Sequence, residues 1–352
     1  MTNTREQPII NDENVFIKGG TMATIKDVAQ RAGLSISTVS RYLNHHPYIT
    51  EDKKIKIQQA MDELDYVPNS VAMQLRSNKS YTIGIIVPRI TNPYFAYLID
   101  AIDKEIKGTP YHTLIMQTYN DKEEELRLLN MFKQRHIAGV IMGALENDIE
   151  VLETYTKYGP IILSADQSMQ SDKVKIIHTN QRQTTYDAIQ YLINKGYRNI
   201  AYCTDNNYYD HCFNKPRNVG FRVAMKDNGL DIRNEWIFNN VHTIEDGEQI
   251  GKILLRQEQL PDAIFTGSDE VALGLMDFMT AHQIDIPNQI AIMGYDNQPI
   301  SSFLKIPLST VNQPVNDIGK QLINYLLALL EETEFKIKDD VLKLNIVERQ
   351  ST

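Results

Sequence analysis

The chain has 352 residues, of which 42% are hydrophobic and 23% are charged, and its formal net charge is −9. This length suffices for two or three domains, and the composition is that of an ordinary globular protein. No apolar run approaches the ~18 residues of a membrane span. The N-terminus lacks the apolar block of a secretory signal. We therefore expect a cytoplasmic protein without a membrane partner.

The charge is unevenly distributed along the chain. Residues 22–80 carry eight Lys and Arg against six Asp and Glu, whereas the remainder is acidic. Positive charge is thus concentrated between residues 22 and 80, as in a segment that meets phosphate groups. Residues 1–21 are polar and net acidic, and we expect a disordered arm or an added upstream extension.

The stretch 24–44, TIKDVAQRAGLSISTVSRYLN, predicts two short helices joined by a tight turn. Thr24 suits an N-cap, and Asp27 completes a variant of the capping box. Gly33 permits the sharp turn, and Ser35 can cap the second helix. The spacing of a small residue, the turn glycine and an apolar residue is typical of a helix-turn-helix, whose second helix enters a DNA major groove. An ordinary αα-hairpin is the alternative.

Two further helices are predicted before the main body of the chain. Thr50 can cap the first of them, and Pro68 follows its end. Residues 69–77, NSVAMQLRS, predict a helix of about two turns, too short to persist alone in water. We interpret this segment as a hinge helix, with a plain interdomain linker as the alternative.

From Tyr81 onward, apolar β-forming runs alternate with helical stretches. This alternation predicts parallel sheets covered by helices on both faces. About 270 residues are many for one such sheet, so two doubly wound lobes with a cleft at the strand ends fit better. The predicted strands are 82–87, 113–117, 139–142, 161–163, 175–177, 200–203, 263–266 and 290–293, and the predicted helices are 93–107, 122–135, 180–195, 219–228, 248–256, 270–282 and 315–331.

Five motifs in order resemble the LacI/GalR family of bacterial repressors: TIKDVAQRAGLSISTVSRYLN, YVPNSVAMQLR, NPYFAYLIDAI, KPRNVGF and GYDNQPISSFLKIPLSTVNQP. The resemblance implies a small all-α helix-turn-helix headpiece and an α/β, two-lobed core like that of periplasmic binding proteins, with doubly wound parallel sheets. It implies a headpiece at 22–68, a hinge helix at 69–80 and a core at 81–352, with lobe 1 at about 81–180 and 312–340 and lobe 2 at about 181–311 and 341–349.

The resemblance also implies which residues contact DNA. Arg41 is the best candidate for reading a base, since arginine forms two hydrogen bonds with guanine. Ile36 and Ser37 occupy outward positions that set operator preference among relatives. Leu75 stands where the family's leucine wedges between the central base pairs. In the hinge helix, Ala72 would allow close packing and Arg76 would lie beside the phosphates. Phosphate contacts are also expected from Thr24, Ser35, Thr38, Asn44 and Thr50.

A second set of candidates would bind an effector between the lobes. Arg217 stands where the family's arginine reaches ligand hydroxyls or a carboxylate. Asp296 is the strongest candidate for accepting bonds from paired hydroxyls, whereas Asp269 can equally cap the helix that follows it. His242 replaces the large aromatic residue common in relatives, and Asp166 lies one residue later than the usual spacing. The other candidates are Asn92, Tyr94, Phe95 and Ser268.

These features predict a homodimeric transcriptional repressor of a carbohydrate-utilisation operon that binds a near-palindromic operator in double-stranded DNA. A small effector, a sugar or sugar phosphate, would change operator affinity through its different affinities for two states. The alternatives are a global catabolite regulator with a phosphocarrier protein as corepressor, and a sugar-binding transport protein. We find no G-x-S-x-G, H-E-x-x-H, P-loop or metal-ligand spacing, so neither an enzyme nor a cofactor is expected.

Overall fold

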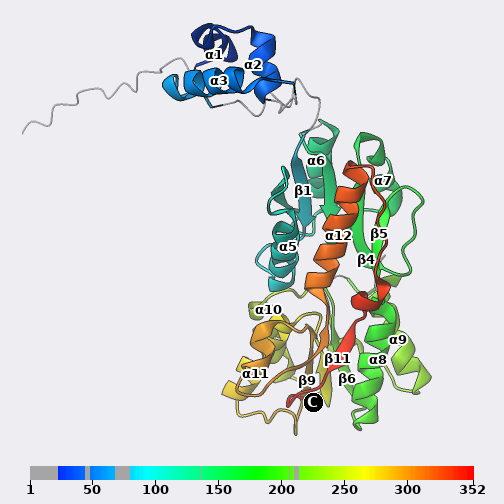
Figure 1. Cartoon of the computed structure of the whole chain (residues 1–352). Coiled ribbons are helices and arrows are strands. Elements are labelled where there is room, and N and C mark those ends of the chain that lie inside the picture. The colour runs from blue at the N-terminus through cyan, green and yellow to red at the C-terminus, as the bar shows by residue number, and fades with distance from the viewer. Residues whose placement is uncertain (1–22, 44–47, 68–79, 135, 206, 210–213) are drawn as a thin grey trace, which may run out of the picture. The chain divides into compact units, whose positions relative to one another are not determined.

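The structure, a computed structural model, describes residues 23–43, 48–67, 80–134, 136–205, 207–209 and 214–352. The chain divides into two compact units, Met1–Lys79 and Ser80–Thr352 (Figure 1). The expected arm and hinge helix lie outside the described residues, as do the candidates Asn44, Ala72, Leu75 and Arg76.

Three helices form the described part of the first unit, and they pack around Val28, Val39 and Ile57, which are fully buried. A core of this size is small for an independent domain. The helices are α1 (Ile25–Ala32), α2 (Ile36–Leu43) and α3 (Glu51–Glu63).

The predicted cap and turn chemistry of α1 and α2 is confirmed. The Thr24 side chain accepts a bond from the backbone N–H of Asp27, whose carboxylate accepts one from the backbone N–H of Thr24. Gly33 ends α1 with a φ of 66°, a conformation that side chains with a Cβ avoid. Oγ of Ser35 accepts a bond from the backbone N–H of Thr38. Thr50 precedes α3, but within the described residues its side chain makes no capping bond.

Lobe 1 of the second unit contains a five-stranded parallel sheet with helices on both faces. Its elements are β1 (Thr82–Val87), α5 (Pro93–Ile106), β2 (His112–Gln117), α6 (Lys122–Lys133), β3 (Gly139–Met142), α7 (Ile149–Glu153), η1 (Thr156–Tyr158), β4 (Ile161–Asp166), β5 (Lys175–Thr179), α12 (Val315–Leu330) and η5 (Asp339–Leu342). The strand order is β2-β1-β3-β4-β5. Helices α5 and α12 cover one face, and α6 and α7 cover the other (Figure 1).

Lobe 2 contains a six-stranded sheet that is parallel except at its β11 edge. Its elements are α8 (Gln181–Asn194), β6 (Ile200–Cys203), α9 (Pro216–Asp227), η3 (Asn234–Trp236), β7 (Ile237–Phe238), α10 (Ile244–Leu254), β8 (Ala263–Phe265), α11 (Asp269–Ala281), β9 (Ala291–Asp296), η4 (Pro299–Ser302), β10 (Ser309–Asn312) and β11 (Asn345–Val347). The strand order is β11-β10-β9-β8-β6-β7, with β10 and β11 antiparallel.

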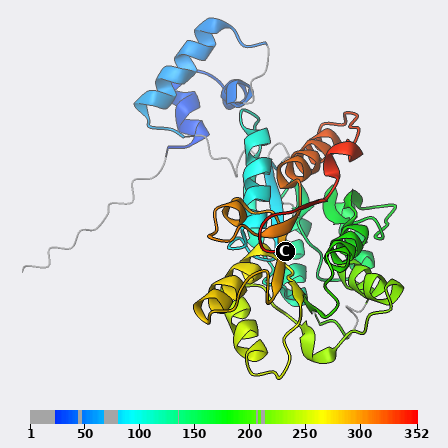
Figure 2. The ribbon, with the colours of Figure 1, turned by 90° about the horizontal axis from the view of Figure 1, so that it is seen from below.

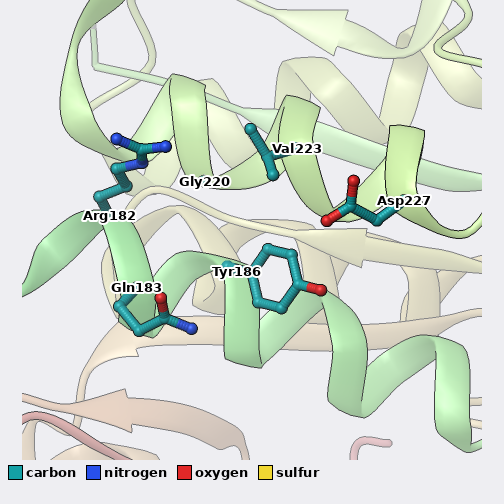
Figure 3. Close-up of a pocket in the computed structure, with 6 residues that line it drawn as sticks. All are labelled: Arg182, Gln183, Tyr186, Gly220, Val223 and Asp227. Carbon is teal, nitrogen blue, oxygen red and sulfur yellow. The ribbon is translucent and has the colours of Figure 1, made fainter.

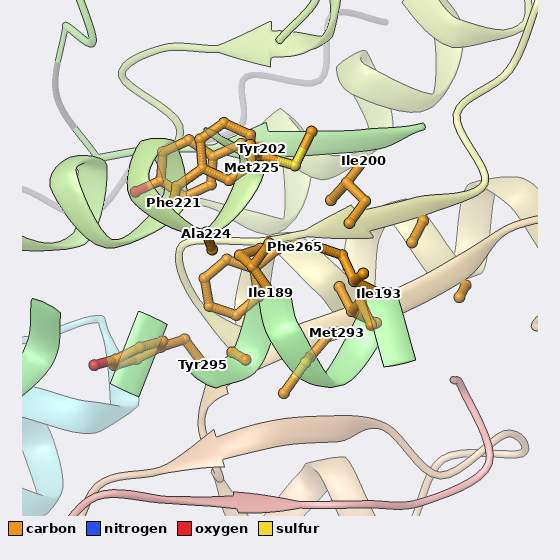
Figure 4. Packing of buried hydrophobic residues seen from close by; sticks show 14 of the residues in the cluster. Ile189, Ile193, Ile200, Tyr202, Phe221, Ala224, Met225, Phe265, Met293 and Tyr295 are labelled. Atoms are coloured by element: carbon orange, nitrogen blue, oxygen red, sulfur yellow. The ribbon is translucent and has the colours of Figure 1, made fainter. Parts of the chain in front are cut away.

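Two helix pairs cover opposite faces of the lobe 2 sheet, α8 with α9 and α10 with α11 (Figure 2). Beneath α8 and α9, the Tyr202 ring stacks on Phe221 at 4.5 Å and on Phe265 at 6.1 Å (Figure 4). Alternate residues of β9 point to opposite faces of the sheet. Met293 and Tyr295 join the cluster beneath α8 and α9, whereas Ile292 packs beneath α10 and α11.

The chain passes between the lobes three times: from β5 to α8, from β10 to α12 and from η5 to β11. Such adjacent crossings are the usual construction of a hinge between lobes. The predicted fold class, helix-turn-helix helices plus a two-lobed α/β core with parallel sheets, is confirmed. No helix in the described part of the chain is long and apolar enough to cross a membrane.

Candidate functional site

The outward face of α2 carries the predicted base-contact residues. Ile36 is 46% exposed, and Ser37 and Arg41 are also exposed. Ser37 and Arg41 are four residues apart, so they share one face of the helix. The opposite face holds the buried Val39, which anchors α2 in the headpiece core. The helix can therefore present these three side chains without losing its packing.

Several predicted phosphate contacts already take part in local hydrogen bonds. The Thr24 hydroxyl donates to Asp27 over 2.7 Å. The Ser35 hydroxyl lies 2.8 Å from those of both Ser37 and Thr38. These bonds fix the starts of α1 and α2, where backbone N–H groups and the helix dipole favour an anion.

In the second unit, one predicted residue from lobe 1 and two from lobe 2 come together. Tyr94, in the first turn of α5, has its phenol close to Ser164, Asp296 and Arg217. Burial, followed by the nearby Asp296 charge, raises the pKa of Tyr94. The segments that carry these side chains lie at or just beyond the carboxyl ends of strands, where open α/β sheets bind ligands.

Arg217, at the start of α9, lies over the Tyr295 ring with its guanidinium carbon 3.7 Å from the ring centre. Its Nη1 donates to the Gly267 carbonyl over 3.0 Å, and its Nε donates to Gln181 over 3.3 Å. Burial would lower the pKa of Arg217, but the surrounding Tyr295, Asp205 and Asp296 outweigh that effect and raise it. The cation is thus held in place by a ring, a carbonyl and an amide.

Asp296 ends β9 and is only 9% exposed. Its Oδ1 accepts a hydrogen bond from Nε2 of Gln313 over 2.7 Å. Burial, and then the charge of Asp269, raises the pKa of Asp296 to about 8. Its backbone has a φ of 114°, a strained conformation for a residue with a side chain. Strain and a perturbed carboxyl together are typical of a functional position.

The carboxylate of Asp269 is held by hydrogen bonds inside lobe 2. It accepts bonds from the backbone N–H of Gln298 and from the hydroxyls of Ser301 and Thr310, at 2.6–2.7 Å. Burial raises the pKa of Asp269 to about 6, because these bonds only partly offset desolvation. Ser268 is the N-cap of α11 and accepts from the backbone N–H of Val271.

Three other lobe 1 candidates have mainly local partners. Oδ1 of Asn92 caps α5 by accepting the backbone N–H of Tyr94. Phe95 packs edge-to-face against Tyr94, with ring centres 5.1 Å apart. Asp166 accepts backbone N–H bonds from Ser168 and from Arg182, so it ties the end of β4 to the start of α8.

His242 belongs to a separate group of charges contributed by both lobes. Burial, and then the charge of Arg89 of lobe 1, lowers the pKa of His242, while Asp205 opposes this shift. Glu146 of lobe 1 similarly feels Lys215 and Asp205 of lobe 2. These charged side chains face one another across the boundary between the lobes.

Tyr295, Gln313 and Glu146 are the residues that our sequence reasoning missed. The Tyr295 hydroxyl is buried and makes no hydrogen bond within the described part of the chain. Figure 4 shows it pointing away from the packed cluster. Tyr295 and Gln313 lie inside the motif GYDNQPISSFLKIPLSTVNQP, which could have identified them. No sequence motif contains Glu146. Its loop is held by Glu125 of α6, whose carboxylate accepts the backbone N–H of Glu146.

A surface hollow of about 360 Å³ lies between α8 and α9 of lobe 2 (Figure 3). It contains none of the predicted effector residues, and its lining residues are Arg182, Gln183, Tyr186, Gly220, Val223 and Asp227. Among the residues that the structure describes, no group of three or more His, Cys, Asp or Glu could hold a metal ion.

Comparison with known families gives two matches. Residues 24–69 match the bacterial regulatory proteins of the lacI family, and residues 189–352 match the periplasmic binding protein-like domain. The chain is 36% identical to the NTD biosynthesis operon regulator NtdR of Bacillus subtilis, over 86% of this chain and 91% of that protein. It is 30% identical to catabolite control protein A of Priestia megaterium, over 94% and 99% of the two chains.

Among solved structures, a LacI family transcriptional regulator from Lactobacillus casei with bound sucrose is similar, with a TM-score of 0.72 and 34% identity. The match covers 77% of this chain and 99% of that one. The same regulator has also been solved with bound glucose, with a TM-score of 0.71 and 35% identity. The lac repressor dimer bound to operator shares the fold, with a TM-score of 0.77 at 21% identity, over 94% of this chain and 98% of that one.

Proposed function

Because the chain belongs to the LacI family of bacterial regulatory proteins, we propose that it is a transcriptional repressor whose operator affinity is set by a carbohydrate bound between its two lobes. The operator is near-palindromic double-stranded DNA in the cytoplasm, and α2 of each headpiece enters a major groove. The proposal includes no enzymatic step. Residues 22–68 form the headpiece, 69–80 the hinge and 81–352 the effector-binding core.

The grouping of Tyr94, Arg217 and Asp296 is the single observation that carries the effector part of this proposal. It combines a phenol, a fixed guanidinium and a carboxyl at the ends of strands from two lobes. A polyol offers hydroxyl groups that both donate and accept, which matches this set of partners. An effector bound to both lobes favours the lobe orientation in which all contacts form.

The similar regulator from Lactobacillus casei supports the chemical class of the effector, since it has been solved with sucrose and with glucose. Two further acidic side chains, Asp166 and Asp205, lie near the cluster of Tyr94, Arg217 and Asp296. Excess negative charge disfavours a phosphate group. We therefore favour an unphosphorylated sugar over a sugar phosphate.

A homodimer is the assembly that the exposed apolar surface supports. β2 is an edge strand of lobe 1 and exposes Leu114 and Ile115. In lobe 2, Ile300 is exposed and Phe303 is 82% exposed. An edge strand offers unpaired backbone groups to another chain, and exposed apolar patches mark interaction sites. A dimer would place two headpieces on the two halves of one operator.

The relationship to catabolite control protein A keeps a second candidate function open, a global regulator whose corepressor is a phosphocarrier protein. The two candidates differ in what must be added to change operator affinity. A sugar alone suffices for the first, and a protein partner is needed for the second.

The test combines thermal shift with DNA binding. Sucrose, glucose and glucose 6-phosphate are each added to the purified full chain, and an operator is selected from random duplexes. We expect a neutral sugar to raise the melting temperature and to change operator affinity. The sugar-effector part fails if no sugar does either and only a phosphocarrier protein alters DNA binding. Failure to select any duplex overturns the repressor assignment.

A further inference from the structure

One buried hydrogen bond joins Asp296 to the second crossing between the lobes. Its donor is Nε2 of Gln313, and both side chains are at least nine-tenths buried. Gln313 directly follows β10 of lobe 2 and precedes Pro314, the N-cap residue of α12 in lobe 1. This bond therefore connects the end of β9 with a segment that must turn when the lobes reorient.

The residue after Asp296 is connected to the third crossing. Nδ2 of Asn297 donates to Oδ1 of Asn312 over 3.0 Å, and Nδ2 of Asn312 donates to Oδ1 of Asn345 over 3.1 Å. Asn345 begins β11, where the chain has returned from lobe 1. Hydrogen bonds thus lead from the two residues at the end of β9 to two of the three crossings.

The backbone at this branching point is strained. Asp296 and Asn297 are consecutive residues with φ of 114° and 52°. Positive φ at two successive non-glycine residues is kept only where surrounding contacts hold it. The side-chain bonds to Gln313 and Asn312 are such contacts. Asn297 is also held by Thr310 and Arg349. The Asp296 carboxyl, by contrast, is held by the side-chain bond from Gln313.

We propose that Gln313 is a positioning residue that couples the state of Asp296 to the orientation of the lobes, and hence to operator affinity. The inference rests on the proposed function. An effector hydroxyl that binds Asp296 shifts the carboxyl that Gln313 holds. Because Gln313 lies within a crossing, the shift favours one lobe orientation over the other. The glutamine need not touch the effector.

The first test requires no effector. Operator affinity is measured for full-length Gln313→Met, for Asp296→Ala and for the double variant. Each single variant breaks the same bond, so we expect each to shift operator affinity in the same direction, by about tenfold. The double variant should show no further shift, because the bond can be lost only once. Additive effects in the double variant would contradict the coupling.

The matched control is Gln321→Met. Gln321 is also a buried glutamine, but its Oε1 accepts the backbone N–H of Lys338 within lobe 1. This variant loses a similar bond away from the Asp296 crossing, so its operator affinity should remain within about twofold of the parent. An equal shift in the control would show that any loss of packing has the same effect.

Gln313→Glu provides a readout that a merely structural role would not change. At about pH 6 the carboxyls of Asp296 and the introduced glutamate share a proton and keep a hydrogen bond, whereas at about pH 9 both ionise and repel. We expect near-parental operator affinity at the lower pH and a shift of about tenfold at the higher pH.

The other titratable or charged groups that face Asp296 are Asp269, Glu270, Arg217, Tyr94 and Tyr295. The parent protein has the same groups, so the operator affinity of the variant is compared with that of the parent at each pH. This variant keeps the size of the native side chain, which also covers the case that Gln313→Met fails to fold. A pH profile identical to that of the parent overturns the inference while the proposed function stands. If the parent itself selects no duplex, both fall together.

Discussion

Two buried carboxyls, Asp269 and Asp296, contribute to the pH dependence of the stability of the core. Their folded-state pKa values are raised to about 6 and about 8, mainly by burial, whereas an aspartate in an unfolded chain titrates near ~3.9. The folded state therefore binds more protons between about pH 4 and pH 8, and its stability falls as the pH rises through that window. Near neutral pH, the raised pKa values of these two carboxyls therefore lower the free energy of unfolding.

This linkage can be measured with Asp296→Asn, which removes one titrating group and keeps the shape. We expect the free energy of unfolding of the wild type to fall relative to the variant as pH rises from about 4 to about 8, by at most about 1.4 kcal/mol per pH unit. Urea unfolding at three pH values gives the difference. Parallel pH dependences of the two proteins would show that Asp296 titrates normally.

Arg41 is the residue at which DNA sequence specificity can be tested. Its exposed place on α2, beside Ser37, suits a bidentate contact with guanine. Arg41→Ala should weaken binding to the selected operator by about 1–3 kcal/mol, with a smaller effect on random duplex. Fluorescence anisotropy with both duplexes measures the two losses. Equal losses would assign Arg41 to phosphate contact alone.

The local sequence pattern predicted which side chains can cap a helix or bind a ligand better than it predicted which way each side chain points. Thr24, Gly33 and Ser35 were predictable because caps and turns depend on neighbours within four residues. Asp269 was harder, since a carboxylate that follows a strand can face a cleft or the interior. Its partners, Ser301 and Thr310, lie more than thirty residues away in the sequence. Only the tertiary fold decides between the two directions.

At the scale of elements, α10 and α11 cross closely because glycines, which have no side chain, stand at their contact. A Cβ on Gly274 would lie 1.8 Å from the Ile244 carbonyl oxygen, and one on Gly247 would lie 2.2 Å from that of Val271. Both atoms belong to backbone, which cannot swing aside. The helices must separate if either glycine gains a side chain.

Gly274→Ala should therefore destabilise the core by about 3 kcal/mol, as measured by urea unfolding. Gly108→Ala is the matched control. Nothing lies within 4 Å of a Cβ at Gly108, whose φ is 86°, so only conformational strain of about 1 kcal/mol is expected there. If the two variants lose equal stability, steric separation of α10 from α11 is not the cause.

Most strands could be predicted from apolar runs, and β10 shows why this signal fails elsewhere. Its sequence, Ser-Thr-Val-Asn, is polar and short. Ser309 and Thr310 are nevertheless fully buried, because their hydroxyls bond to Arg349 and Asp269. Burial that depends on partners from other elements leaves no local pattern.

At the scale of the whole molecule, the exposed apolar surface leads to a prediction about assembly. Ile115→Asp on the β2 edge should raise the dimer dissociation constant by about tenfold or more, since a charge would be buried in the contact. Operator affinity should fall with it, because two linked headpieces bind more tightly than one. Sedimentation and DNA titration measure the two effects.

Tyr209→Ser is the control for that experiment, since Tyr209 is an equally exposed large side chain, at 49% against 44% for Ile115. It should leave the association state unchanged. A dimer that tolerates the aspartate at position 115 would place the subunit contact on a different surface.

The interleaved lobes also bear on how the chain reaches its native state. The lobe 1 sheet is complete at Thr179, but α12, which covers one of its faces, begins only at Val315. During synthesis that apolar face must wait while all the strands from β6 to β10 emerge. Lobe 1 therefore cannot be completed until most of lobe 2 has been synthesised, and until then α5 alone covers this face. An apolar surface left partly uncovered in a nascent chain is prone to aggregation.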